Sequence, residues 1–231
     1  MRAQLVKIGK SALDFFLPQN CLGCGREGRV LCLSCIAKLP RISPPLCHLC
    51  GLPSQGLKCP DCSRQKPAFD GLRSPFCFDK LVREVIHQFK YHNIRCLAEP
   101  LAIELVKYMQ QNPLPSELVV PVPLHPYRLR KRGYNQSELV ARYMGRMLGL
   151  KVDTKSLRRI VNTKSQAMLE KALLRHKNMK DAFVSSSPVQ GKKILLVDDV
   201  STSGSTLNSC ASALKKAGAA SVWGLTIARE I

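Results

Sequence analysis

The residues whose types and spacing can do chemistry gather in residues 193–207, which read KILLVDDVSTSGSTL. Residues 194–197 form a short apolar run, the pattern of a strand buried on both faces of a parallel sheet. Two adjacent carboxylates follow, Asp198 and Asp199, and then a loop of small hydroxyl residues around Gly204. Apolar residues at three- and four-residue spacing predict a helix from there. The stretch therefore predicts a strand, an acidic pair, a polar loop and a helix N-terminus.

The acidic pair and the loop offer complementary binding chemistry. Backbone N–H groups at a helix N-terminus lack internal partners, and small loop residues let a phosphate approach them. Carboxylates at the carboxyl end of a strand can accept hydrogen bonds from sugar hydroxyls or hold Mg²⁺ through water. A ribose with a 5′-phosphate would satisfy both parts. An ordinary capped turn explains one Ser and one Asp, but not two carboxylates beside a buried strand, where charge is costly.

This stretch resembles the phosphoribosyl pyrophosphate (PRPP) motif of type I phosphoribosyltransferases, which has four apolar residues, two acidic residues and a loop rich in Ser, Thr and Gly. It is not a Walker loop, because no Lys follows Gly204. The resemblance implies that Asp198 and Asp199 are catalytic and that PRPP binds with Mg²⁺. The loop residues that it assigns to PRPP binding are Val200, Ser201, Thr202, Ser203, Gly204, Ser205 and Thr206.

A second unit of strand, polar segment and helix precedes the motif. Residues 118–123 read LVVPVP, which suits a buried strand with a frayed, proline-bounded end. Asn135, with Glu138 three residues later, predicts a helix start. In a PRPP site, the segment between them would be a cationic loop that faces the pyrophosphate, with Arg132 near it; the alternative is a solvated run of charge. Its cations are Arg128, Arg130, Lys131 and Arg132.

Eight of the 11 cysteines lie in four C-x₂-C pairs near the N-terminus. This spacing predicts two Cys₄ zinc sites with structural ions. Disulfides are the alternative, but they suit secreted domains, and the sequence shows no signal-peptide pattern. His48 lies between two cysteines and is expected to be exposed rather than a ligand. Sequential pairing is the simplest arrangement, and interleaved pairing stays open. The predicted ligands are Cys21, Cys24, Cys32 and Cys35, and Cys47, Cys50, Cys59 and Cys62.

The charge indicates an anionic partner. The 231 residues include 36 Lys and Arg against 16 Asp and Glu, a formal net charge of +20. Residues 128–180 alone hold 15 basic and three acidic residues. Nucleic acid is the leading partner for such a chain. Lys90 lies beside Tyr91 in a pattern that also suits a solvated helix end. The candidate nucleic-acid contacts are Lys90, Arg128, Arg130, Lys131, Arg159, Lys164 and Arg175.

The organisation is that of an α/β protein. We expect an amino-terminal helix and double zinc ribbon in residues 1–66 and a type I phosphoribosyltransferase-like parallel-sheet domain in residues 67–231. Further strands are predicted at residues 71–78, 182–184 and 221–228. Helices are predicted at residues 81–89, 97–111 and 170–178. No apolar run of transmembrane length occurs, so a cytoplasmic protein is expected.

The whole chain resembles the ComF family, which joins a double zinc ribbon to a type I phosphoribosyltransferase-like domain. The resemblance implies a PRPP-binding protein that acts on single-stranded DNA in natural transformation or in the use of DNA as a nutrient. It implies cytoplasmic action, with DNA-uptake machinery or recombination proteins as further partners. The resemblance rests on the four cysteine pairs, Phe89-Lys90-Tyr91, the 120–123 VPVP run, the 132–136 RGYNQ run, Gln166, the 175–178 RHKN run and the acidic motif.

Three hypotheses stay open. The protein is an enzyme that transfers ribose phosphate to an unidentified acceptor, a non-catalytic DNA-binding protein regulated by PRPP, or a nucleobase-salvage phosphoribosyltransferase. The enzyme hypothesis leans towards a glycosyltransferase that uses the acidic pair, because a carboxylate steadies the ribose as positive charge develops. Salvage ranks last, because no segment after the final predicted strand would recognise a free base.

Overall fold

The computed structural model describes residues 20–162 and 182–231. The chain divides into two compact units, Met1–Leu39 and Pro40–Ile231. The domain boundary that the sequence predicts after residue 66, where the cysteine pairs end, stays a prediction. The compact units divide earlier, after Leu39, between the second and the third cysteine pair. The helices predicted before residue 19 and at residues 170–178 lie outside the described residues. Within the described residues, no helix is long and apolar enough to cross a bilayer.

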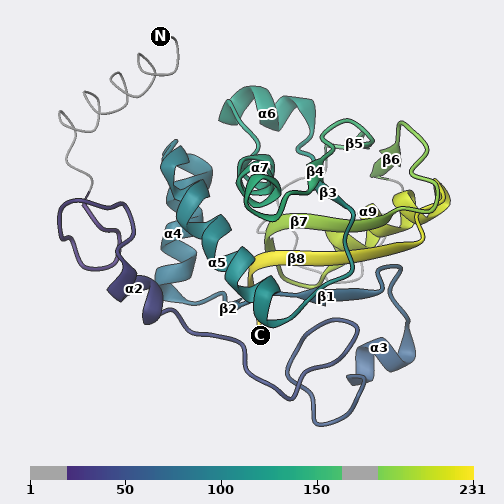
Figure 1. Cartoon of the computed structure of the whole chain (residues 1–231), viewed down its shortest axis with the longest axis horizontal. Coiled ribbons are helices and arrows are strands. Elements are labelled where there is room, and N and C mark those ends of the chain that lie inside the picture. Colours follow the sequence, from purple (N-terminus) through teal and green to yellow (C-terminus); the bar gives the residue numbers. More distant parts are fainter. Residues whose placement is uncertain (1–19, 163–181) are drawn as a thin grey trace. The chain divides into compact units, whose positions relative to one another are not determined.

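A parallel sheet organises the larger unit, as the sequence predicts (Figure 1). Within the described residues its strand order is β1-β8-β7-β3-β4, with β2 pairing β8 beyond the end of β1. The acidic motif lies on β7, which is flanked by β8 and β3 and is therefore central. The strands are β1 (Gly71–Arg73), β2 (Phe76–Cys77), β3 (Leu118–Pro121), β4 (Lys151–Val152), β7 (Lys193–Ser201) and β8 (Ser221–Arg229).

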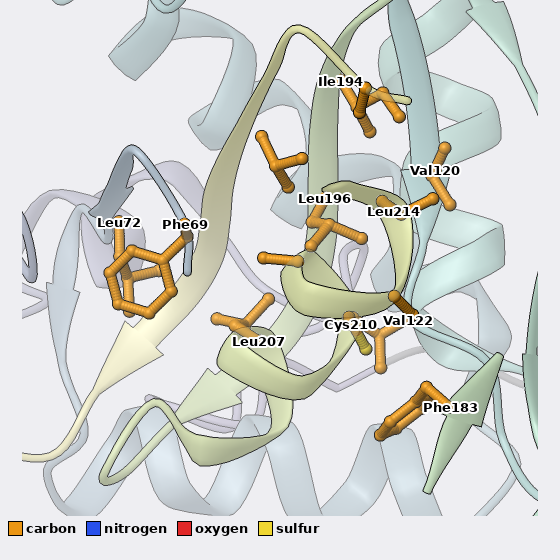
Figure 2. Close-up of a cluster of buried hydrophobic side chains, with 14 of the residues drawn as sticks. Phe69, Leu72, Val120, Val122, Phe183, Ile194, Leu196, Leu207, Cys210 and Leu214 are labelled. Carbon is orange, nitrogen blue, oxygen red and sulfur yellow. The ribbon is translucent and has the colours of Figure 1, made fainter. Parts of the chain in front are cut away.

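Helices cover both faces of β7. Ile194 and Leu196 belong to a buried cluster with Leu207 and Leu214 from α9 (Figure 2). Leu195 is equally buried, and successive strand residues point to opposite faces, so it packs on the other side. There α7 contacts β3 and β7, while α5 packs on α7. The helices of this unit are α3 (Pro60–Arg64), α4 (Lys80–Tyr91), η1 (Arg95–Leu97), α5 (Ala98–Gln111), α6 (Pro126–Arg132), α7 (Gln136–Leu148) and α9 (Ser205–Lys216).

Two sequence expectations differ from the structure. The strand predicted at residues 71–78 is two short strands, β1 and β2, separated at Ser74-Pro75, where proline cannot donate to a ladder. The prediction of a loop for residues 126–132 is wrong, because these residues form α6. Pro126 occupies the first turn, and the His125 ring accepts a hydrogen bond from the Tyr127 N–H at 3.2 Å. Gly133, with φ of +80°, ends the helix.

A small antiparallel pair stands apart from the main sheet. It consists of β5 (Leu157–Arg159) and β6 (Phe183–Ser185), and β6 confirms the strand predicted near residue 183. The Arg159 guanidinium lies over the Phe183 ring at 5.3 Å. This pair packs on α9 and carries Arg159, one of the predicted nucleic-acid contacts.

Candidate functional site

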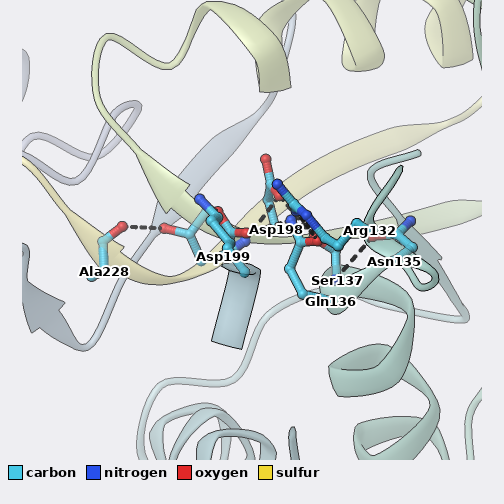
Figure 3. A network of polar contacts seen from close by, with 9 residues as sticks. Arg132, Asn135, Gln136, Ser137, Asp198, Asp199 and Ala228 are labelled. Atoms are coloured by element: carbon cyan, nitrogen blue, oxygen red, sulfur yellow. Dashed lines mark hydrogen bonds and ion pairs between the residues drawn. The ribbon is translucent and has the colours of Figure 1, made fainter. Parts of the chain in front are cut away.

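The acidic pair lies at the carboxyl end of β7, where two helices deliver partners to it (Figure 3). Asp199 is 4% exposed. Its Oδ1 accepts from the Lys90 ammonium of α4 at 2.7 Å, and its Oδ2 accepts from the Gln136 amide of α7 at 2.5 Å. Both oxygens of this buried carboxylate thus have a partner, which offsets the cost of burying its charge.

Asp198 is held in a different way from its neighbour. Its Oδ1 accepts from the Ser137 hydroxyl at 2.8 Å and from the Asp199 backbone N–H at 2.9 Å. Within the described residues its Oδ2 bears no hydrogen bond. Burial first, and then the Asp199 charge, raise the pKa of Asp198 to about 7. Asp198 is therefore the member of the pair that is ready to take a ligand hydroxyl or a hydrated cation.

The Arg132–Ser137 segment arranges the partners of the acidic pair. The Asn135 side chain accepts from the Ser137 N–H at 3.1 Å and donates to the Val122 carbonyl at 3.0 Å, so it caps α7 and joins it to the residue that follows β3. Arg132 donates to the Gln136 side-chain oxygen at 2.5 Å. Gln136 thus links the Arg132 cation to Asp199, as Figure 3 shows.

The predicted phosphate loop follows the acidic pair directly and leads into α9. Gly204 precedes the helix with φ of +77°, a conformation that favours glycine. The Ser203 hydroxyl accepts from the Ser205 N–H at 3.4 Å. Residues 200–202 and 204–207 line a hollow of about 20 Å³, room for about one water, so a phosphate would bind at the mouth of the loop. These features fit a backbone cradle for an anion at a helix N-terminus.

Three of the predicted cations lie close enough to repel one another. Burial, followed by the Arg132 charge, lowers the pKa of Arg128. Burial and then the Arg128 charge lower the pKa of Arg159, and the negative charge of Asp198 acts in the opposite direction. The structure therefore brings the cations of α6 and β5 together on the side of the acidic pair. Arg130 and Lys131 are exposed on α6, whereas Lys164 and Arg175 lie outside the described residues.

The cysteines form two groups in the sequential arrangement. In each group the four sulfur atoms lie within 4.8 Å of one another, as a tetrahedral zinc site requires. Backbone N–H groups of Gly23 and Cys32 donate to the Cys21 sulfur at 3.4 and 3.3 Å. His48 is exposed and belongs to neither group. The groups, called here the first and second cysteine sites, are Cys21, Cys24, Cys32 and Cys35, and Cys47, Cys50, Cys59 and Cys62.

Thiol acidity differs within each site: a hydrogen bond with Cys32 and then burial raise the pKa of Cys35 to about 12, and burial raises the pKa of Cys50 to about 11. The Ser34 hydroxyl, followed by the Cys35 N–H, lowers the pKa of Cys32 to about 6. Burial acts to raise the pKa of Cys47, but the N–H groups of Cys50, Cys59 and Leu49 bring it down to about 6. Zinc binds the thiolate form, so these donors fit zinc as the structural ion of each site.

The sequence analysis did not identify Gln136 and Ser137 as partners of the acidic pair, and it did not predict that Lys90 contacts this pair. Gln136 and Ser137 were not assigned to the site, although they follow Asn135, whose capping pattern was recognised. Lys90 was assigned to nucleic acid, and that assignment stays a prediction. In the structure its ammonium contacts Asp199, 109 residues away. No local pattern could reveal such a contact.

Comparison with family models supports both parts of the chain. Residues 12–77 match the double zinc ribbon domain, and residues 127–229 match the phosphoribosyl transferase domain. Similar solved structures include a glutamine PRPP amidotransferase from B. subtilis, at 17% identity and a TM-score of 0.40, covering 57% of this chain and 26% of that chain. Another is a purine phosphoribosyltransferase from Pyrococcus horikoshii, at 14% identity and 0.36, covering 56% and 70%.

Relatives match across most of the chain. DNA utilization protein YhgH of Salmonella typhi is 34% identical over 200 residues, covering 83% of this chain and 87% of the relative. Competence protein F of Haemophilus influenzae is 34% identical over 208 residues, covering 84% and 89%. Competence protein ComFC of Bacillus subtilis is 28% identical over 214 residues, covering 87% and 84%. With its double zinc ribbon, its phosphoribosyltransferase-like sheet and these relatives, the chain belongs to the ComF family.

Proposed function

We propose that this protein binds PRPP with Mg²⁺ at the carboxyl end of β7 and acts on single-stranded DNA in the cytoplasm. Its biological role is DNA uptake in natural transformation or the use of DNA as a nutrient. The observation that carries the proposal is the acidic pair beside the N-terminus of α9, which Gly204 precedes. In this pair both oxygens of Asp199 have hydrogen-bond or ion-pair partners, whereas one oxygen of Asp198 is left to accept from a ligand. The acidic pair suits a pair of sugar hydroxyls or a hydrated Mg²⁺, and the helix N-terminus suits a 5′-phosphate.

Each part of PRPP has a group of suitable chemistry in this arrangement. The 5′-phosphate binds the N–H groups and hydroxyls of residues 201–206, and Asp198 takes the ribose hydroxyls or the metal's water ligands. Lys90 and Gln136 hold Asp199 in place, so it acts as a fixed charge beside the ribose. Arg132, which is anchored by Gln136, binds the pyrophosphate together with Arg128.

The DNA part of the proposal rests on charge and on the names of the relatives. The formal net charge of +20 and the exposed cations of α6 suit a phosphodiester backbone. The relatives are named for competence and for DNA utilization. DNA-uptake machinery or recombination proteins would then deliver or receive the strand. Neutralised phosphates release counterions, so DNA affinity should fall steeply as salt rises, and a flat response would contradict an electrostatic groove.

The decisive experiment is calorimetric titration of PRPP and Mg²⁺ into the zinc-loaded protein, with and without single-stranded DNA. The D198N/D199N double variant should lose PRPP binding. The matched control D79N neutralises an exposed carboxylate that makes no side-chain hydrogen bond at the start of α4, and it should bind normally. Undiminished affinity in the double variant would place the site elsewhere.

Two extensions of this titration refine the assignment. The pKa of Asp198 is about 7, so its carboxylate is protonated below that pH; Mg²⁺-dependent PRPP affinity should rise from pH 6 to pH 8, and this rise should shrink in D198N. Pyrophosphate release in the presence of DNA would indicate transfer of phosphoribose to an acceptor. Binding without release would favour PRPP as a regulator.

A further inference from the structure

Arg229, the last residue of β8, is a buried cation with incomplete pairing. Arg229 is 2% exposed, and within the described residues its Nε has no hydrogen-bond partner. No carboxylate in the described part of the chain lies within ion-pair distance of it. A guanidinium removed from water in this way requires a counter-charge, because burial without one is strongly unfavourable.

The surroundings of Arg229 join the second cysteine site to the phosphate loop. Arg229 lines a pocket of about 470 Å³ together with Cys50, Cys59 and Cys62 on one side and residues 202–205 on another. Its Nη1 donates to the Ser201 hydroxyl at 3.5 Å. Ser201 and Arg229 are also register partners between β7 and β8. One buried side chain therefore reaches the start of the phosphate loop from beside the second cysteine site.

The second cysteine site can supply the missing counter-charge. Zn²⁺ bound by four thiolates is a doubly negative centre. Groups just outside a metal's ligands tune its affinity. The loaded centre and the guanidinium thus stabilise each other. The other charged side chains of the pocket, Asp61, Arg64 and Lys66, are exposed and screened by solvent, and Asp61 pairs with Arg64 at 2.6 Å.

We infer that Arg229 is a positioning residue that couples metal occupancy of the second cysteine site to the phosphate loop through Ser201. With the metal bound, Arg229 is charge-compensated and holds Ser201. Without the metal, Arg229 loses its counter-charge, and the start of the loop loses its support. This inference rests on the proposed PRPP site. Because coupling is reciprocal, PRPP must strengthen zinc retention at the second site by the same factor as zinc strengthens PRPP binding.

The test follows zinc release to a chromophoric chelator from the full-length chain, with the first cysteine site removed by C21S and C24S. In this background, R229Q should weaken zinc affinity about 10- to 100-fold. Saturating PRPP and Mg²⁺ should strengthen zinc retention about 10-fold in the parent and not in R229Q. The control K66Q removes an exposed cation from the same pocket and should match the parent in both measurements.

Ser201→Ala keeps the inference testable where R229Q does not fold. This variant leaves the guanidinium beside the thiolates, so zinc affinity should stay near that of the parent. Because Ser201 belongs to the proposed phosphate loop, PRPP is added until calorimetry shows that it saturates this variant, and its effect on zinc retention should then be absent. Zinc retention strengthened by PRPP to the parental degree in S201A, or in a folded R229Q, would overturn the coupling. Calorimetry separates the two proposals: a parent that does not bind PRPP refutes the proposed function, whereas PRPP binding that is equal in parent and R229Q refutes only the coupling.

Discussion

The two cysteine sites have the same ligands and similar spacing, yet they differ in what surrounds them. In the first site, Cys24 is exposed and Cys32 is half-buried. In the second, all four cysteines are buried and belong to the same apolar cluster as Phe69 and Leu72. The backbone N–H of Leu72 in β1 also donates to the Leu49 carbonyl at 2.7 Å. The first site is therefore a self-contained knuckle, whereas the second is part of the core of the sheet unit.

The largest difference should appear when each site loses its metal. C47S/C50S should shift the cooperative unfolding transition of the sheet unit to much lower denaturant, because a structural zinc site contributes a large share of the roughly 5–15 kcal/mol by which a domain is stable. C21S/C24S should leave that transition unchanged. Trp223, the single tryptophan, lies on β8 and reports this transition by fluorescence. Equal losses in the two variants would show that the sites do not differ in this way.

A smaller difference should follow from the glycine after each knuckle. Gly51 has φ of +70°, and a Cβ there would lie 2.3 Å from the Leu72 carbonyl oxygen; Gly25 has φ of +71° and nothing within 4 Å. G51A should therefore destabilise the sheet unit by roughly 3 kcal/mol, from strain and overpacking together. G25A should cost about 1 kcal/mol and only locally. Denaturant unfolding followed by Trp223 should shift in G51A alone, and a matching shift in G25A would contradict the comparison.

The smallest difference is expected in the rate of metal loss from the intact protein. A chelator can reach the first site directly at the exposed Cys24, whereas all four cysteines of the second site are buried and can be approached only through the pocket beside Arg229. Zinc release should show two phases that differ by at least ~10-fold in rate. The C21S/C24S variant identifies them, since it should lack the fast phase. Loss of the slow phase instead would reverse the assignment.

Sequence patterns predicted the local units of this fold and missed the contacts between them. The β7 motif, the capped start of α7 and the sequential cysteine groups were all readable, because each depends on neighbouring residues. The prediction of a loop at α6 was wrong, because a dense run of cations was taken as the mark of a loop. Pro126 and Gly133, which bound this two-turn helix, were the signals of its start and end. The pairing of Lys90 with Asp199 depends on how α4 and β7 pack, which no single segment encodes.

The Lys90–Asp199 contact also bears on when the site comes into existence during synthesis. A ribosome makes the chain from its N-terminus, so all four ligands of the first cysteine site exist once residue 35 has been made. The acidic site needs α4, α7 and β7, whose contacting residues lie 63 and 109 positions apart. Such long-range closure is slow and comes late. A nascent chain would therefore complete its first cysteine site well before it could assemble the proposed PRPP site, and a truncated product would retain only the cysteine site.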